Sequence, residues 1–488
     1  MGMTPFCDTG QGGINRVNVP IPEIPSHDNT GPFRRFIAPR LALFNAAGWV
    51  TSTYIGQQFL RLGASILLAW LLAPELLGTM LLINTLRTGV ELLTDVGVGQ
   101  SIVHNPRGND PAFYNTAWTI QIVRGIVLFI VALALTIPMA HVYENASLES
   151  LIPVIAPIFI LTGITSPSRF LLQKRMEVRK VALFDLALVF AGSAIQIALA
   201  IYSPTIWALV WGLLITTALA TVGSFFLIDW RSHRLHWDKS AAREILHFGK
   251  WIFAASLIYF LAMNFDRLYF ADAIPIALLG VYGIARTFSD TIMQLFQRMG
   301  QLLIFPKIAS TVQRGADLRK SIGPMRLVGL IGIAAGLAMG MALADEFIYV
   351  VYDQRYHAAG FFLTILLFGT WFSILGTMAD SMMMGIGKPS SVALSNAVKL
   401  AILAAALPFA LVQYGINEAL AVFVVAEAAR YLVLMVKQRS AGVAFSRQDI
   451  LATLIFIILI FAFRELTMLV GLTGGIGDWL QQAGIRNG

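Results

Sequence analysis

Positive charge is unevenly distributed along this chain, and this pattern constrains the fold more than any other feature. Twelve or thirteen apolar stretches fill residues 45–472, each near the roughly 20 residues that a membrane-spanning helix needs. Of the 35 Lys and Arg residues, 24 lie in the N-terminal segment and the even-numbered loops, against Arg355 and Arg486 on the other side. The positive-inside rule therefore predicts a polytopic membrane protein with a cytoplasmic N-terminus.

Composition supports this fold class. The chain is 57% hydrophobic and 13% charged, whereas soluble proteins carry about 25% charged residues. The net charge of +8 is accounted for by cytoplasmic loops that meet anionic lipid, so we expect no nucleic-acid partner. The single cysteine, Cys7, has no partner for an internal disulfide or a metal site.

The apolar stretches divide the chain into five predicted parts. These are a disordered cytoplasmic tail at 1–44, a six-helix bundle at 45–228, a cytoplasmic linker at 229–247, a second six-helix bundle at 248–440, and an extra C-terminal helix with its tail at 441–488. The fold class is thus all-α, with a 12-helix core and a thirteenth span near 449–472. Because Arg464-Glu465 interrupts that span, the total can be 12, 13 or 14, and the C-terminus can lie on either side.

Short matches between the halves indicate a duplication. Three of them recur in the same order: Leu76-Leu77-Gly78 as Leu278-Leu279-Gly280, Gly99-Gln100 as Gly300-Gln301, and Val181-Ala182-Leu183 as Val392-Ala393-Leu394. The third register places Arg169 opposite Asp380, and Asp185 opposite Asn396. An even number of spans separates the copies, so the repeat is parallel. Transporters built this way bind their substrate between the halves.

Polar side chains inside the spans line up on helix faces. An ionised group at mid-bilayer costs about 2.5–3.5 kcal/mol on insertion scales, so such groups need partners, water or a function. The stripes are Tyr54, Gln58, Arg61 and Ser65 in the first span, Asn84, Arg87, Glu91 and Asp95 in the second, Asn264, Asp266 and Arg267 in the seventh, and Arg286, Asp290, Gln294 and Arg298 in the eighth. Their spacing puts each set on one helical face. A watered cavity between the halves is the natural place for these faces.

Two interpretations of these charges stay open. Neighbours such as Arg87 and Glu91, or Arg286 and Asp290, can satisfy one another as i, i+4 ion pairs that only hold helices together. Glu427 and Arg430 allow the same interpretation. The interior charges are nine basic and eight acidic, so their balance does not prove an anionic substrate. Buried carboxylates also suit a coupling ion, H⁺ or Na⁺, and the candidates are Asp266, Asp290, Asp380 and Glu427. We expect no metal site and no other cofactor.

Nine segments resemble one family. They are 71–83 (LLAPELLGTMLLI), 95–103 (DVGVGQSIV), 168–184, 207–212 (WALVWG), 264–272 (NFDRLYFAD), 277–290 (ALLGVYGIARTFSD), 304–310 (IFPKIAS), 384–390 (MGIGKPS) and 414–420 (YGINEAL). Together they resemble the Wzx-type oligosaccharide and polysaccharide flippases of the multidrug/oligosaccharidyl-lipid/polysaccharide exporter superfamily. The resemblance covers about residues 45–438. Ala271-Asp272 departs from it, because the family often has a glycine there.

The resemblance implies a function and roles for the stripes. Its members move an undecaprenyl-pyrophosphate-linked oligosaccharide across the bacterial inner membrane by ion-coupled alternating access, without enzymatic chemistry. The diphosphate would then be bound by Arg61, Arg87, Arg267 and Arg286, and the sugar hydroxyls by Tyr54, Gln58, Asn84 and Gln294. Membrane lipid would surround the polyprenyl tail. A polysaccharide polymerase and chain-length proteins are the implied partners, and we expect a monomer.

Other functions remain as alternatives. A multidrug or cation exporter of the same superfamily needs a more acidic and aromatic cavity than four arginines provide. A lipid II flippase fits the series of motifs less well than the polysaccharide branch does. A membrane glycosyltransferase or polymerase needs an acidic metal motif or large outer loops, whereas the group of Asp345, Glu346 and Asp353 reads as a solvated loop. A structural subunit would not need polar stripes in both halves.

Overall fold

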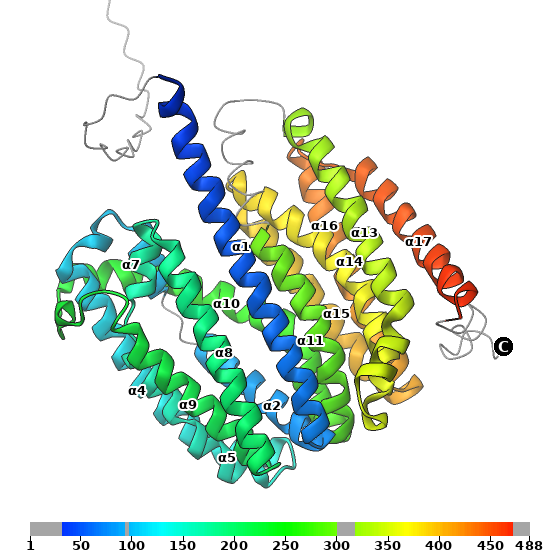
Figure 1. Ribbon diagram of the computed structural model, residues 1–488, viewed down its shortest axis with the longest axis horizontal. Helices are drawn as coiled ribbons and strands as arrows, with labels where there is room; N and C mark the ends of the chain where they lie inside the picture. Colours follow the sequence, from blue (N-terminus) through cyan, green and yellow to red (C-terminus); the bar gives the residue numbers. More distant parts are fainter. Residues whose placement is uncertain (1–31, 93–96, 300–317, 472–488) are drawn as a thin grey trace, which may run out of the picture. The chain divides into compact units, whose positions relative to one another are not determined.

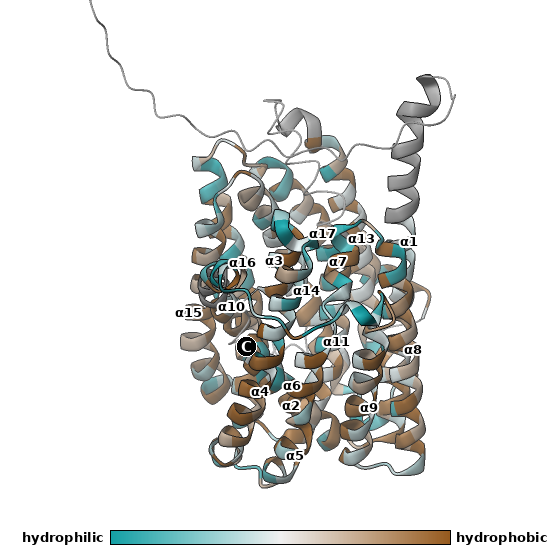
Figure 2. Ribbon diagram, turned by 90° about the vertical axis from the view of Figure 1, so that its left-hand side faces the viewer, coloured by the Kyte–Doolittle hydropathy of each residue, from teal (hydrophilic) through white to brown (hydrophobic). Residues whose placement is uncertain are grey.

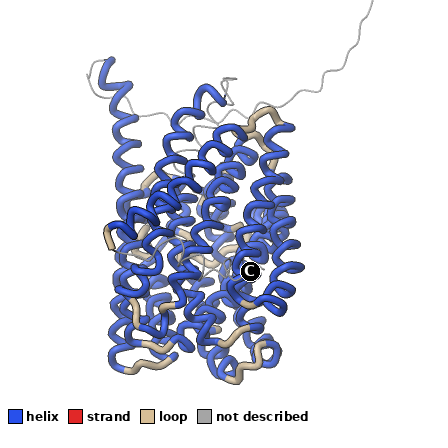
Figure 3. The backbone as a smooth tube through the Cα atoms, turned by 90° about the vertical axis from the view of Figure 1, so that its right-hand side faces the viewer, coloured by secondary structure: helices blue, strands red, loops and turns tan. Residues whose placement is uncertain are grey.

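The described part of the structure, a computed structural model, is entirely helix and loop (Figure 3). It comprises residues 32–92, 97–299 and 318–471. Cys7, Asp95, the Gly300-Gln301 match, the 304–310 motif and the tail after 471 lie outside these ranges. Hydrophilic colour in Figure 2 gathers on connecting segments near α3 and α7, while the long helices are mostly apolar. The all-α prediction is confirmed.

The first half of the chain supplies the helices of the first six predicted spans. In order they are α1 (Pro32–Leu71), α2 (Pro74–Leu92), α3 (Val98–His104), η1 (Pro106–Asn109), α4 (Pro111–Val142), α5 (Ser147–Ile155), α6 (Pro157–Ile164), α7 (Ser168–Lys174), α8 (Val178–Tyr202) and α9 (Ile206–Ser224). The predicted fourth span is interrupted at Pro157, where α6 begins. Helix α1 begins at Pro32, so the stretch 32–44, predicted as disordered tail, is helical.

The second half supplies the remaining spans. They follow η2 (Trp230–Ser232) and are α10 (Lys239–Ala273), α11 (Ile276–Met299), α13 (Leu318–Val351), η4 (Gln354–Tyr356), α14 (Ala358–Gly385), α15 (Pro389–Tyr414), α16 (Ile416–Ser440) and α17 (Ser446–Leu469). Residues 239–247, predicted as linker, are the first turns of α10 because Asp238 caps the helix by accepting a hydrogen bond from the Ser240 backbone N–H. Residues 46–488 form one unit by their contacts, so the division into two bundles stays a prediction.

Within the described ranges, nine helical segments are long and apolar enough to cross a membrane. Helices α1, α2, α10 and α11 are not among them, and these four carry the polar stripes. In α2 and α11 the described stripe residues lie between the middle of the helix and its C-terminal end. These helices pack on one another: α2 contacts α10 and α11, as can be followed in Figure 1. Part of the polar surface therefore meets other helices, while Arg61 and Gln294 stay exposed.

The duplicated glycines Gly78 and Gly280 meet one another. A Cβ atom added to Gly78 would overlap the carbonyl oxygen of Ile276 and lie 2.9 Å from the Gly280 nitrogen. One added to Gly280 would overlap the carbonyl oxygen of Pro74 and lie 3.0 Å from the Gly78 nitrogen. The first turns of α2 and α11 therefore touch backbone to backbone, which only glycine permits. This Gly78–Gly280 contact lies at the predicted outer end of both helices.

Two hydrogen bonds join the halves at the same end of the helices. The Tyr356 hydroxyl donates to the carbonyl oxygen of Leu72 at 2.9 Å, and Tyr356 is fully buried. The Trp70 indole N–H donates to the carbonyl oxygen of Val351 at 2.7 Å. Together with the Gly78–Gly280 contact, these bonds close the predicted outer end between the halves.

On the predicted cytoplasmic side, residues 233–238 form a strap that fastens the start of α10 to α4. Three backbone N–H groups of the strap donate to side chains of α4: Arg234 to Asn115, His236 to Thr119 and Asp238 to Thr116, at 3.1, 3.2 and 3.0 Å. Arg107 adds ion pairs to Asp238 at 2.9 Å and to Glu244 at 3.1 Å. Hydrogen bonds from Ser240, followed by that from Arg107, lower the pKa of Asp238 to about 2, so this anchor stays ionised at physiological pH.

The predicted thirteenth span exists as α17, which packs along α13 (Figure 1). Trp371 of α14 stacks on Phe456 with ring centroids 4.7 Å apart. Arg464 does not interrupt the helix: it is buried and donates to the carbonyl oxygen of Ala342 at 3.1 Å. Its charge pairs with Asp345 at 3.6 Å. Asp345 therefore lies inside α13 and not, as predicted, in a solvated outer loop.

The Gly78–Gly280 contact predicts a steep cost for a single methyl group. Gly78→Ala or Gly280→Ala should destabilise the fold by about 1–3 kcal/mol, because the backbone contact must open. At Gly63 of α1 an added Cβ meets no described atom within 4 Å, so Gly63→Ala is the matched control. Thermal unfolding of the purified variants in detergent measures the effect. Equal midpoints for all three variants would contradict the contact.

The strap carries a histidine whose titration should weaken it in acid. The His233 Nε2 atom lies 2.6 Å from the Ser166 hydroxyl and 3.1 Å from that of Tyr114. Burial lowers the pKa of His233 below its ordinary value, against the opposing effects of the Trp230 carbonyl and Asp229. As the pH falls, His233 therefore takes up a proton at a higher pH in the unfolded state than in the folded state. The free energy of unfolding decreases as the pH falls from about 6.5 through the lower pKa of the folded state.

This effect is measurable as a difference between variants. The gap in thermal midpoint between the wild type and His233→Gln should shrink by a few degrees as the pH falls from neutral to about 5. His236, exposed on the same strap, gives the control His236→Gln, which should keep the wild-type pH dependence. A gap that widens in acid would show that the protonated imidazole is the stabilising form.

Candidate functional site

Three of the four residues predicted to bind sugar, Tyr54, Gln58 and Gln294, meet where α1 faces α11. The Gln58 amide donates to the Tyr54 hydroxyl at 2.7 Å and to the Gln294 side-chain oxygen at 3.4 Å. Gln294 is exposed, whereas Gln58 is buried. Arg61 lies on the same face of α1, one turn beyond Gln58, and is exposed with no ion-pair partner among the described residues. Arg298, on the α11 stripe, is likewise exposed with no ion-pair partner among the described residues. The first and eighth spans thus share a polar surface with two uncompensated cations.

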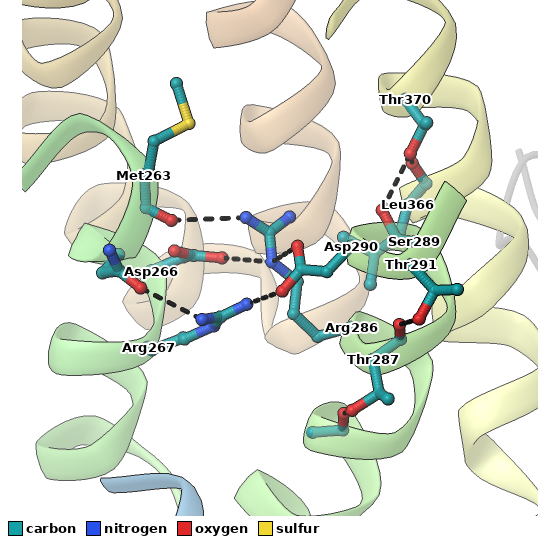
Figure 4. Close-up of polar contacts among 12 residues, drawn as sticks. Met263, Asp266, Arg267, Arg286, Thr287, Ser289, Asp290, Thr291, Leu366 and Thr370 are labelled. Atoms are coloured by element: carbon teal, nitrogen blue, oxygen red, sulfur yellow. Dashed lines mark hydrogen bonds and ion pairs between the residues drawn. The ribbon is translucent and has the colours of Figure 1, made fainter. Parts of the chain in front are cut away.

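A cluster of two arginines and two aspartates joins α10 to α11 (Figure 4). Arg267 forms an ion pair with Asp290 through one guanidinium nitrogen. Another nitrogen of the same guanidinium donates to the Asn264 side-chain oxygen at 3.0 Å. The Arg286 Nε atom lies 3.4 Å from Asp290 and 3.6 Å from Asp266. Arg286 and Asp266 are buried, but Asp290 is partly exposed. The cluster has no net formal charge.

A second buried charge network connects α14, α15 and α16. The Lys399 ammonium donates to Glu427 at 2.6 Å, and neither side chain is more than 3% exposed. Arg430 lies 3.4 Å from Glu427, forms an ion pair with Asp380, and donates from Nε to the Asn396 oxygen at 2.9 Å. Two acids and two cations again cancel. This pairing is what allows the charges to lie in a bilayer.

Phe423 and Met263 lie where the two clusters approach one another. Arg286 stands over the Phe423 ring, 4.5 Å from its centroid, and the Lys399 nitrogen lies 5.4 Å from the same centroid. Met263 accepts a 3.3 Å hydrogen bond from Arg286 at its carbonyl oxygen, and its sulfur lies 3.4 Å from the Lys399 nitrogen. The four candidate coupling acids therefore belong to adjacent clusters, each with a cation in place.

Arg87 lies apart from these groups. It pairs with Glu91 on its own helix at 3.1 Å and borders a small apolar pocket formed with α4, α5 and α6. Asn84, one turn earlier, is partly exposed. Next to Glu91 a cavity of about 500 Å³ opens in the first half, lined by polar side chains that include Gln100, Gln121 and Arg169. The second-span stripe therefore borders the interior of its own half.

The duplication register has a structural counterpart. Arg169 donates to both oxygens of Asp185, at 2.8 and 2.9 Å. At the equivalent positions, Asp380 and Asn396 both bond to Arg430, which α16 contributes. In the first half the acid, Asp185, stands at the second of the two equivalent positions, and in the second half the acid, Asp380, stands at the first. In the second half a third residue, Arg430, supplies the cation.

The partner roles of Lys399, Asn396 and Tyr282 were not predicted. The pairing of Arg430 with Glu427 inside α16 was predicted and is confirmed, whereas its contacts with Asp380 and Asn396 were not, because they depend on which helices are neighbours. Tyr282, whose hydroxyl donates to Asp266, sits on an apolar stretch and gives no signal of its own. A mid-span lysine without a nearby acid in its own helix is the one usable indication, since such a charge must find its partner on another helix.

The arrangement of helices defines the class of protein first. The fold is that of transporters of the multidrug/oligosaccharidyl-lipid/polysaccharide superfamily. It matches the lipid II flippase MurJ in an inward closed conformation with a TM-score of 0.70 and 13% identity, covering 89% of this chain and 95% of that one. An inward-facing multidrug resistance transporter of the MATE family matches with a TM-score of 0.64 and 14% identity, over 81% and 98% of the two chains.

Sequence comparison then gives the family. The profile of the polysaccharide biosynthesis protein family matches residues 67–360, more than half of the chain, and the chain belongs to that family. It is similar to the lipopolysaccharide biosynthesis protein WzxC of Escherichia coli K12, with 23% identity over 55% of this chain and 54% of the relative. It is also similar to the teichuronic acid biosynthesis protein TuaB of Bacillus subtilis, with 20% identity over 57% of each. The chain thus matches little more than half the length of these relatives, and the predicted resemblance is confirmed.

The buried network predicts a large penalty for removing one charge. Lys399→Met should destabilise the protein by about 3–5 kcal/mol, because Glu427 loses its nearest counter-charge inside the bundle. Lys437→Met, at an exposed position of α16, is the control and should have little effect. Adding Glu427→Gln to Lys399→Met should restore part of the loss, measured by thermal unfolding in detergent. A double variant less stable than Lys399→Met alone would argue against the pair.

Proposed function

We propose that this protein flips an undecaprenyl-pyrophosphate-linked oligosaccharide from the inner to the outer leaflet of the bacterial inner membrane, by ion-coupled alternating access and without enzymatic chemistry. The proposal orients the chain with its N-terminus in the cytoplasm. Membership of the polysaccharide biosynthesis family supports the substrate class. The names of the relatives WzxC and TuaB, each concerned with a cell-surface polysaccharide, support it as well.

The observation that carries the proposal is the surface shared by α1 and α11. Arg61 is exposed and has no acidic partner among the described residues. It lies one helical turn from Gln58, whose amide bonds to the Tyr54 hydroxyl and to Gln294. An uncompensated guanidinium suits a diphosphate, and hydroxyl and amide groups suit sugars. Arg267 and Arg286 already contact aspartates, so they would have to exchange these for the substrate. We therefore assign the leading role in diphosphate binding to Arg61.

Alternating access requires the two ends of the path to open in turn. The Gly78–Gly280 contact and the Tyr356 hydrogen bond close one end, which supports an arrangement that receives substrate from the opposite side. The four candidate coupling acids, Asp266, Asp290, Asp380 and Glu427, lie in the two charge clusters of the second half. Exchange of a proton or Na⁺ there would change how α10, α11 and α14 to α16 attract one another.

Neutralising Arg61 should abolish export. In the source bacterium, deletion of the gene should cause a lipid-linked oligosaccharide to accumulate on the inner leaflet, and the wild-type gene should clear it. Arg61→Gln should lower the export rate roughly tenfold or more, the effect of losing one charge-assisted contact. Arg355→Gln, at an exposed arginine whose ion-pair partner among the described residues is the nearby Asp353, is the control and should export normally.

The same experiment separates the main alternative. If deletion leaves no oligosaccharide on the inner leaflet and instead changes sensitivity to cationic drugs, the multidrug exporter is correct and the flippase proposal is wrong. Quantifying the accumulated lipid by mass spectrometry after leaflet-specific labelling gives both results from one set of strains.

A further inference from the structure

A separate pocket lies on the predicted cytoplasmic side, between α3 and the first turns of α10. Its volume is about 580 Å³. Ser101 and His104 of α3 line one wall, and Arg243 and His247 of α10 line the other. Helix α3 follows α2 in the chain, and this part of α10 leads into the striped segment. The pocket therefore lies beside the ends of two helices that carry the proposed path.

The pocket offers hydrogen-bond donors that the protein leaves unused. The Ser101 side-chain oxygen is buried and has no hydrogen-bond partner among the described residues. Arg243 is exposed and makes no ion pair with any described acid. A buried hydroxyl without a partner loses the hydrogen bonds it would make in water. A ligand that accepts a hydrogen bond from it is therefore favoured.

The one carboxylate in the wall is already occupied. Glu244 accepts a hydrogen bond from Arg107 at 3.1 Å with one oxygen and from Asn105 at 2.8 Å with the other. Its charge is therefore compensated by Arg107. What remains for a ligand is a guanidinium, two imidazoles and a hydroxyl. This set suits an oxyanion, and phosphate oxygens in particular.

Exposed apolar side chains place the pocket near the level of lipid headgroups. Trp230, which precedes the strap, and Trp237, which lies within it, are 61% and 53% exposed, and Leu246, adjacent to His247, is 48% exposed. Tryptophan at such positions is typical of the membrane–water interface. A lipid phosphate is therefore the ligand that this position favours.

We propose that this pocket binds the phosphate or diphosphate group of a membrane lipid through Arg243, His104, His247 and Ser101. Two lipids carry that chemistry: an anionic phospholipid, and the diphosphate-linked substrate of the proposed function. The pocket goes beyond that function, and binding is measured without transport. A failed flipping assay would therefore leave this inference intact. Likewise, absence of pyrophosphate binding to the pocket would leave the proposed function intact.

Isothermal titration of the detergent-purified full chain with inorganic pyrophosphate tests the pocket. The wild type should bind it, Arg243→Gln should weaken binding roughly tenfold or more, and Ser101→Ala should weaken it about fivefold. Arg231→Gln, at an exposed arginine of η2 outside the pocket, is the matched control and should bind as the wild type does. Unchanged thermal midpoints confirm that the variants are folded.

Nanodiscs distinguish the source of the phosphate. If phosphatidylglycerol in place of phosphatidylcholine weakens pyrophosphate binding by the wild type but not by Arg243→Gln, phospholipid headgroups occupy the pocket. If the two bilayers give the same affinity, the pocket selects a diphosphate; either result supports the inference. Absence of pyrophosphate binding at millimolar concentration in detergent overturns it, as does equal binding by the wild type, Arg243→Gln and Ser101→Ala.

Discussion

An ionised side chain inside a bilayer costs about 2.5–3.5 kcal/mol, and this protein has many of them in its spans. Compensation of that charge is the constraint on which the rest of the structure depends. In the second half, Asp266, Asp290 and Glu427 each contact a cation from a different helix or an adjacent turn. These pairs tie α10, α11, α15 and α16 together at defined heights in the membrane. Packing of the apolar faces then fills the space between them.

Arg61 is the exception that gives the site its chemistry. The described residues provide no acid for it, although it lies in the middle of a helix between polar neighbours. Its exposure and the exposure of Gln294 distinguish the α1–α11 surface from the paired charges of the cluster that begins one turn away at Asp290. A transporter needs both kinds of charge: paired groups that keep the helices in place, and at least one group that is free to meet the cargo.

Features of the fold and of the site that are set within one helix could be predicted from the sequence. Contacts that depend on which helices are neighbours could not. Spans follow from the length of apolar stretches, so long apolar helices such as α8 and α14 can be recognised from the sequence. Stripe positions follow from the helical repeat, and Gln58 does meet Gln294. The pair of Lys399 and Glu427 was beyond reach, because it depends on two helices being neighbours. Arg87 bonding to Glu91 within one helix was visible, but not the pocket that it borders.

The glycine contact also bears on how such a chain arose. In a symmetric dimer of a six-helix ancestor, the residue at this position would face its own copy across the two-fold axis, as isologous interfaces require. Gly78 and Gly280 face one another in that manner within a single chain. Fusion of two gene copies would preserve the interface and free each glycine to diverge. That neither has gained a side chain is understandable, because a change on either side would obstruct the other.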